Sequence, residues 1–120
     1  MKTSIVKDKS EKFALRIVDM YKYLNNTKKE YVLSKQILRS GTSIGANINE
    51  ALRGQTKKDF YAKMSIAYKE CAETAYWLDL LYGSNYITNK EYDSMSDQNL
   101  ELLKMLAAIT KTQKTLTPNS

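Results

Sequence analysis

Histidine is absent from this chain of 120 residues, and proline, cysteine and glycine are scarce, with one, one and four copies. Without histidine the chain cannot form Ser–His or Cys–His nucleophile pairs, and most zinc and di-iron sites are excluded. The single proline, Pro118, lies near the end, so the interior has almost no chain breakers. Sandwiches and barrels are disfavoured because they need frequent turns. Ordinary fractions of hydrophobic (42%) and charged (27%) residues indicate one globular domain.

The only cysteine is Cys71, which allows no intramolecular disulfide and suits a reducing cytoplasm. It falls on a core position of its helical pattern, so a packed thiol is favoured over a nucleophile. The first residues carry charges where a signal peptide needs an apolar stretch, and no window approaches the roughly 18 apolar residues of a membrane helix. We expect a cytoplasmic protein with no membrane partner.

Apolar residues recur at steps of three and four in four segments, which predicts amphipathic helices over about residues 5–24, 29–52, 56–83 and 88–113. Thr56 and Thr88 are each followed three residues later by an acidic residue, as in a capping box, and Ser4 is expected to cap the first helix. Gly83 marks the end of the third helix. Because the connections are short, consecutive helices are predicted to run antiparallel.

The predicted fold is therefore all-α: an antiparallel up-down-up-down four-helix bundle formed by residues 1–113, with a polar C-terminal tail over residues 114–120. Glycine and hydroxyl residues cluster between residues 39 and 45, which invites assignment as a loop. The helical periodicity passes through this cluster unbroken, so we predict a helix in which Gly41 and Gly45 allow a neighbouring helix to approach closely.

Positive charge is concentrated in the first part of the chain. Residues 1–69 carry fifteen basic and six acidic residues, whereas residues 70–120 carry four and seven, and the net charge is +6. Such a surface attracts polyanions or acidic proteins, although a merely soluble, lysine-rich surface is the alternative. One basic group shares a face of the first helix, and two lysine pairs are expected to begin the second and third helices at opposite ends of the bundle. The candidate nucleic-acid contacts are Lys9, Lys12, Arg16, Lys28, Lys29, Lys57 and Lys58.

Two polar stripes adjoin the apolar faces of the second and third helices. We expect Arg39 and Lys63 to pair with glutamates in a helix–helix or subunit interface, where a bonded network fixes register; the alternative is a set of exposed residues. A di-iron site is disfavoured because residues 70–73 supply two glutamates and no histidine. The candidates for the structural or interface network are Arg39, Ser43, Asn47, Glu50, Glu70, Glu73 and Trp77.

Nine tyrosines are many for this length. Those of the third helix, together with Trp77, are expected to form a half-buried aromatic surface. Amphipathic rings of this kind suit protein interfaces, and stacking on unpaired bases is the alternative.

Three stretches carry a resemblance to a known family: residues 59–61, residues 66–78, and Ser-Lys-Gln-Ile-Leu-Arg-Ser-Gly-Thr-Ser-Ile-Gly-Ala-Asn-Ile-Asn-Glu-Ala over residues 34–51. Together they resemble bacterial four-helix-bundle proteins first met as products of intervening sequences within large-subunit ribosomal RNA genes, often labelled S23 ribosomal protein. The resemblance covers about residues 5–112 and departs at Cys71, where alanine is more usual. It implies a ring-like homopentamer, no enzymatic activity, no cofactor and distant kinship to basic accessory proteins of diversity-generating retroelements, which bind nucleic acid and a reverse transcriptase.

The leading hypothesis is therefore a non-enzymatic oligomeric bundle that binds nucleic acid, with structured RNA favoured over DNA, through its basic surface. The alternative is a scaffold or accessory protein whose partner is another protein. An enzyme would need a deep pocket around Glu70 and Glu73, together with carboxylates of perturbed pKa.

Overall fold

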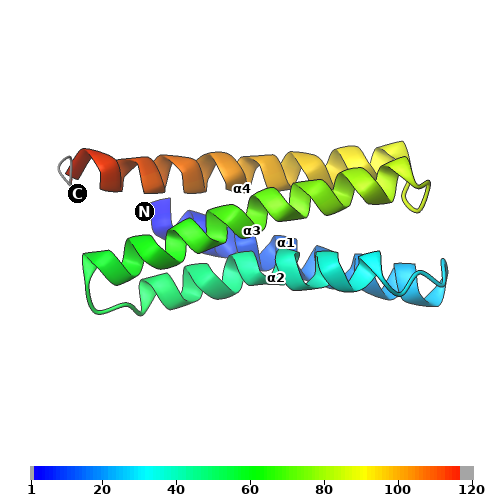
Figure 1. Ribbon diagram of the computed structural model, residues 1–120, viewed down its shortest axis with the longest axis horizontal. Helices are drawn as coiled ribbons and strands as arrows, with labels where there is room; N and C mark the ends of the chain where they lie inside the picture. Colours follow the sequence, from blue (N-terminus) through cyan, green and yellow to red (C-terminus); the bar gives the residue numbers. More distant parts are fainter. Residues whose placement is uncertain (1, 117–120) are drawn as a thin grey trace.

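The computed structural model describes residues 2–116, which form four α-helices and no strand. They are α1 (Lys2–Asn26), α2 (Leu33–Leu52), α3 (Lys57–Gly83) and α4 (Asn89–Leu116). Successive helices reverse direction along one axis, so the α1–α2 and α3–α4 connections lie at one end and the α2–α3 connection at the other (Figure 1). The bundle measures 49 × 24 × 22 Å. The predicted four-helix bundle is confirmed.

The core is formed by the apolar stripes, whose residues recur at steps of three and four along each helix. In the predicted stripes of α2 and α3 only Leu33 and Phe60, at the helix starts, keep part of their surface exposed. The predicted stripe of α1 is buried throughout; its members are Val6, Ser10, Phe13, Ile17, Met20 and Leu24. The other buried members are Ile37, Gly41, Ile44, Ile48 and Ala51 in α2, and Met64, Ala67, Cys71, Thr74, Leu78 and Leu81 in α3. Burial of an apolar side chain contributes roughly 1.5–3 kcal/mol, so these stripes hold the four helices together. The largest fully buried side chains are Phe13, Ile17, Leu24, Ile37, Ile44, Ile48, Met64, Leu78, Leu81, Leu102, Leu106 and Val6.

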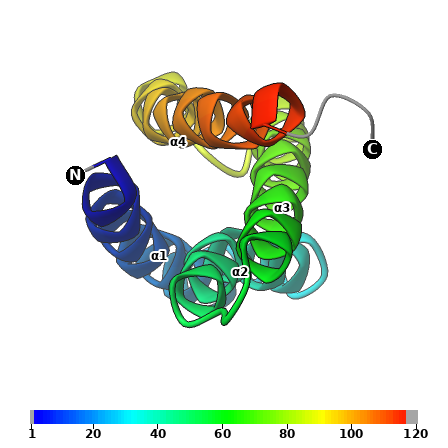
Figure 2. The ribbon, with the colours of Figure 1, turned by 90° about the vertical axis from the view of Figure 1, so that its left-hand side faces the viewer.

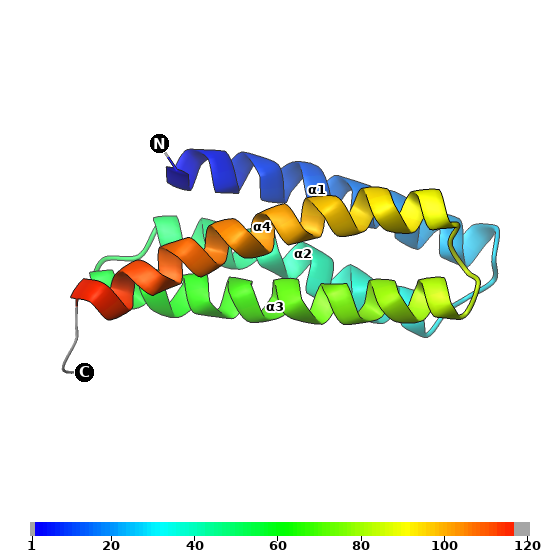
Figure 3. The same cartoon turned by 90° about the horizontal axis from the view of Figure 1, so that it is seen from above.

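The four helices do not pack equally. Each helix packs closely against its neighbours in sequence, and α1 and α4 contact each other least. Viewed along the axis, the helices are arranged as an open curve whose gap lies between α1 and α4 (Figure 2). Figure 3 shows that α4 runs obliquely to the other helices. The α1–α4 side is consequently the least tightly closed side of the bundle.

The helix through residues 39–45 is continuous, as predicted, and its glycines lie against α1. A Cβ atom on Gly41 would lie 2.8 Å from Ile17 Cγ1, and a Cβ on Gly45 would lie 3.2 Å from Ser10 Oγ. Glycine is therefore needed at position 41 for the close approach of α1 and α2.

Several helix ends differ from the predictions. Ser4 lies inside α1, which begins at Lys2, so it is not a cap. The prediction that α2 begins near residue 29 is wrong, because residues 27–32 form a turn before Leu33. Helix α3 ends at Gly83 as predicted, yet the left-handed residue of the next turn is Asn85, with φ 66°. Helix α4 continues through Leu116, three residues into the predicted tail, and residues 117–120 lie outside the described residues.

Both predicted capping boxes have side-chain bonds at the expected positions. The Thr56 hydroxyl accepts a bond from the Asp59 N–H at 3.0 Å. At the start of α4 the bonds are reciprocal: Thr88 Oγ1 accepts from the Glu91 N–H at 3.1 Å, and Glu91 Oε1 accepts from the Thr88 N–H at 2.8 Å. Among the described residues, no helix combines the length and apolarity that crossing a membrane requires.

Candidate nucleic-acid interface

The turn between α1 and α2 carries the first lysine pair. Lys28 and Lys29 are exposed and lie in this turn. The prediction that they begin the second helix is wrong, because α2 starts at Leu33. The N–H groups of Thr27 and Lys28 donate to the Tyr23 carbonyl at 2.9 and 3.3 Å, and Lys29 has a left-handed φ of 56°. The Lys28 ammonium lies 5.9 Å from the centre of the Tyr23 ring. The two lysines are thus held at one end of the bundle by the main chain of the turn.

Glu30 fixes the same turn from inside. Its carboxylate is buried and accepts bonds from the N–H groups of Val32 and Leu33, both at 3.0 Å, and of Ser34 at 2.7 Å. Burial raises the pKa of this carboxyl, but the backbone N–H bonds lower it by more, so its pKa lies below the usual value. A negative charge at the start of a helix is also favourable. Glu30 was not among the predicted site residues; the signal in the sequence was an acidic residue just before the apolar stripe of α2.

The second lysine pair lies at the opposite end of the bundle, as predicted from the antiparallel order (Figure 1). Lys57 and Lys58 are the first two residues of α3, and both are exposed. Cations at a helix N-terminus face the positive end of the helix dipole, which is slightly unfavourable. These lysines are therefore not placed where they would stabilise the helix that carries them.

The basic row of α1 is largely engaged with α4. Lys9 Nζ lies 2.9 Å from Glu101 Oε1, and Arg16 Nη1 donates to Gln98 Oε1 at 2.6 Å. Only Lys12 of this row is exposed without such a contact in the described part of the chain. The row thus bridges α1 to α4, and less of its charge is available to a partner than the sequence suggested.

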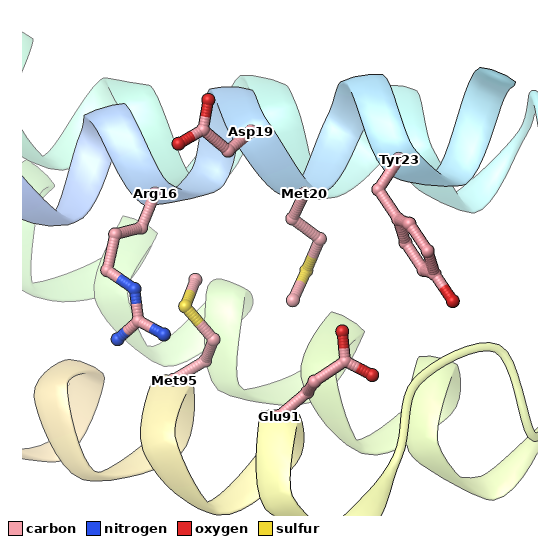
Figure 4. Close-up of a pocket in the computed structure, with 6 residues that line it drawn as sticks. All are labelled: Arg16, Asp19, Met20, Tyr23, Glu91 and Met95. Carbon is pink, nitrogen blue, oxygen red and sulfur yellow. The ribbon is translucent and has the colours of Figure 1, made fainter. Parts of the chain in front are cut away.

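A shallow pocket of about 260 Å³ lies farther along the α1–α4 side. Met20 and Met95 extend toward each other across it, and Glu91 extends from α4 toward α1 (Figure 4). The Glu91 carboxylate is already used in capping α4. Arg16, Asp19 and Tyr23 complete the lining. Among residues 2–116, no group of three or more His, Cys, Asp or Glu side chains is placed to hold a metal ion.

The polar stripes of α2 and α3 meet on the outer surface of the α2–α3 seam. Arg39 pairs with Glu73 and, at 3.3 Å, with Glu70, and Glu73 also accepts a bond from Trp77 Nε1 at 3.2 Å. The Arg39 side chain is 55% exposed, whereas Glu70 is 17% exposed. The Arg39–Glu70–Glu73–Trp77 network is thus half-buried between two helices and open to solvent on one side.

Other members of the predicted network lie elsewhere. Glu50 pairs with Lys63 at 2.8 Å, across the same seam but nearer the α2–α3 turn. Ser43 Oγ donates to the Arg39 carbonyl at 2.6 Å and Asn47 Nδ2 to the Ser43 carbonyl at 2.8 Å. These two side chains bond within α2, so they do not link the helices.

A polar contact that was not predicted from the sequence lies in the core between α3 and α4. Asn99 Nδ2 donates to the Cys71 carbonyl at 3.0 Å, and Cys71 Sγ lies 3.2 Å from Asn99 Oδ1. Burial raises the pKa of the Cys71 thiol to about 12, so the thiolate is not formed at neutral pH. The signal for Asn99 was its place in the apolar stripe of α4, between Met95 and Leu102.

Comparisons with known proteins agree with this architecture. The sequence pattern of the family described as 23S rRNA-intervening sequence protein matches residues 2–108. The chain is similar to a protein of unknown function from Bacteroides thetaiotaomicron VPI-5482, a member of the S23 ribosomal protein family whose crystal structure is known. The two sequences are 55% identical, and the two structures superimpose with a TM-score of 0.91. The similarity covers 92% of this chain and 99% of that one. Among curated proteins, none matches the chain.

Proposed function

The chain belongs to the family of 23S rRNA-intervening sequence proteins, and on this premise we propose that it is a non-enzymatic cytoplasmic bundle that binds structured RNA through its basic surface. This membership confirms the family resemblance stated on residues 34–51, 59–61 and 66–78. The proposal assigns no cofactor and no metal to the protein. Its nucleic-acid contacts are the two lysine pairs, Lys28–Lys29 and Lys57–Lys58, with Lys12 between them along the bundle.

The observation that carries the proposal is uncompensated positive charge. In the part of the chain described, neither lysine pair makes an ion pair, although all four side chains are exposed. Three of the six acidic residues within residues 1–69 are already engaged: Glu11 pairs with Lys7, Glu50 pairs with Lys63, and Glu30 is buried in its turn. Exposed lysines of this kind favour contacts with phosphates that are independent of sequence and strongly weakened by salt.

The test is binding of the nucleic-acid-free protein to an RNA duplex and a matched DNA duplex over a salt series. Lys28→Gln/Lys29→Gln and Lys57→Gln/Lys58→Gln each remove two charges at one end of the bundle. Lys69→Gln/Lys104→Gln removes two charges from exposed helix positions away from the turns and is the matched control.

We expect affinity to fall steeply with salt, and the slope to decrease by about 1 for each contacting lysine removed. At least one end variant should lose affinity more than the control. An equal loss in all three variants would mean that only net charge matters, and no binding at low salt would overturn the proposal. Tighter binding to RNA than to DNA is the expected preference.

We also propose that the protein assembles with copies of itself, as the homopentamer that the family resemblance implies. Such an assembly would repeat each lysine pair around a ring and raise the local positive charge. The α2–α3 seam suits a subunit contact, because Ile66 and Tyr76 are 41% and 55% exposed on α3, near the Arg39 network. Native mass spectrometry measures the number of subunits directly, and a monomer at working concentration would refute this part.

The second candidate function, a protein-interaction scaffold, rests on the same exposed Ile66 and Tyr76. It predicts that Ile66→Asp abolishes capture of a protein partner while binding to RNA is absent in every variant. The salt series therefore separates the two functions before any partner is known.

A further inference from the structure

The turn between α1 and α2 presents two large apolar side chains to solvent. Tyr31 is 51% exposed and Val32 is 70% exposed, the highest value among the large apolar residues described. Exposed apolar side chains that adjoin one another in a turn make no contribution to the core. Neither residue was predicted to be exposed in a turn, because the periodicity predicts a helix over residues 29–52.

This turn is held in one conformation. Glu30 accepts three main-chain N–H bonds through its carboxylate, and its own N–H donates to the Leu24 carbonyl at 2.9 Å. Ser34 Oγ donates back to the Glu30 carbonyl at 3.0 Å. A surface that is already ordered loses little conformational entropy when a ligand binds. Tyr31 and Val32 therefore project from a pre-organised turn.

The exposed charges of the chain segment that forms this turn are of one sign, whereas Asp19 and Glu91 line the pocket beside Tyr23. Lys28, Lys29 and Lys35 lie within four residues of Tyr31, and all three are exposed. Glu30 is the only acidic residue between Asp19 and Glu50 in the sequence, and its carboxylate is buried and bonded to the main chain. An exposed aromatic ring in a segment of exposed lysines that make no ion pair suits single-stranded nucleic acid, because a base stacks on the ring while phosphates contact the ammonium groups.

We propose that the α1–α2 turn is a contact site for an unpaired base of RNA, with the base stacked on the Tyr31 ring and packed against Val32. The lysines at positions 28, 29 and 35 contact the flanking phosphates. This inference rests on the proposed RNA binding and adds to it a preference for loops, bulges or ends over a continuous duplex. An anionic membrane is the competing ligand, and it is disfavoured because two apolar side chains bury little area.

The test compares binding of the full chain to a short oligouridine and to a blunt RNA duplex of equal length. Tyr31→Ala should weaken oligouridine binding about tenfold or more and leave duplex binding within about twofold. Tyr31→Phe keeps the ring and should bind like the wild type. Tyr68→Ala is the control, since Tyr68 is 37% exposed on α3 and belongs neither to the turn nor to the proposed subunit contact. Both tyrosines are exposed, so the variants should stay folded, which thermal unfolding checks.

A second readout reports the contact directly. Oligouridine that carries 5-bromouridine, irradiated in the complex, should cross-link to the tryptic peptide of residues 30–35. Equal oligouridine affinity of Tyr31→Ala and wild type, or cross-links only elsewhere, would overturn the inference while RNA binding itself survives. Absence of binding to both RNAs by the wild type would overturn RNA binding and the inference together. Tyr31-dependent binding to anionic vesicles, with oligouridine binding unchanged, would assign the turn to membranes and refute it.

Discussion

Replacing Gly41 by alanine adds one methyl group at the closest contact between α1 and α2. The new Cβ would lie 2.8 Å from Ile17 Cγ1 and 2.9 Å from its Cδ1 and Cγ2. These atoms cannot move away easily, because Ile17 is fully buried and a β-branched side chain is restricted at χ1. The substitution therefore forces α1 and α2 apart or strains the rotamer of Ile17.

The expected magnitude follows from two opposing terms. Alanine is better than glycine inside a helix by about 1 kcal/mol. Overpacking a core contact costs about 1–3 kcal/mol, and we take the upper part of this range because all three close contacts are with one rigid side chain. Gly41→Ala should thus lower the free energy of unfolding by about 1–2 kcal/mol.

Urea unfolding followed by circular dichroism measures this loss, at one fixed protomer concentration so that assembly does not change the reference. Gly83→Ala is the control, because a Cβ at Gly83, the last residue of α3, would meet nothing within 4 Å. This control should be neutral or stabilise the protein by up to about 1 kcal/mol.

A double-mutant cycle isolates the contact itself. Ile17→Ala removes the three atoms that the new methyl group meets, so the loss in Gly41→Ala/Ile17→Ala should be smaller than the sum of the single losses by about 1 kcal/mol or more. Stabilisation by Gly41→Ala to the same extent as by Gly83→Ala would refute the close-packing argument.

Three further predictions concern polar groups. Glu30→Gln should lower the free energy of unfolding by about 1–2 kcal/mol at neutral pH. Because the pKa of Glu30 is lowered in the folded state, its stabilisation is present above the unfolded pKa of about 4.3 and is lost as the pH falls through the folded pKa. Acid titration of the variant, followed by its unfolding, should therefore lack this loss of stability. Cys71 should react with a thiol reagent only as fast as the fold opens, because the thiol is buried with a pKa of about 12; rapid labelling of the native protein would contradict this. Arg39→Ala should lower the free energy of unfolding of the monomer by less than about 1 kcal/mol, since the guanidinium is half-exposed. If the α2–α3 seam is a subunit contact, the same variant should show fewer assembled subunits in native mass spectrometry.

The helices were predictable from the sequence because their signals are local. The stripe from Val6 to Leu24 and the Thr88–Glu91 capping box depend on residues a few positions apart, and the structure contains both. The α1–α2 turn was not predictable in this way. Its path depends on a left-handed lysine at position 29, a conformation that lysine rarely adopts, and on a buried glutamate whose three partners come from the main chain.

The candidate sites were less predictable than the fold because each polar side chain can bond to more than one partner. Arg39 reaches glutamates on α3, whereas Ser43 finds an acceptor one turn back in its own helix, and helical spacing alone cannot separate these outcomes. The engagement of Lys9 and Arg16 depends on how α4 crosses α1, which no local pattern specifies. The two exposed lysine pairs were correctly predicted to lie at opposite ends of the bundle, because this requires only the order of the helices.

The weak α1–α4 side has a consequence for how the protein folds. All close helix pairs are neighbours in sequence, and only the sparse α1–α4 contact joins distant parts of the chain. Few long loops must close before most native contacts form, so the loss of chain entropy on the way to the transition state is small. We expect rapid folding in which α2 and α3 pair early. Substitutions at the α1–α4 contact should then act mainly on the unfolding rate, because that contact forms last.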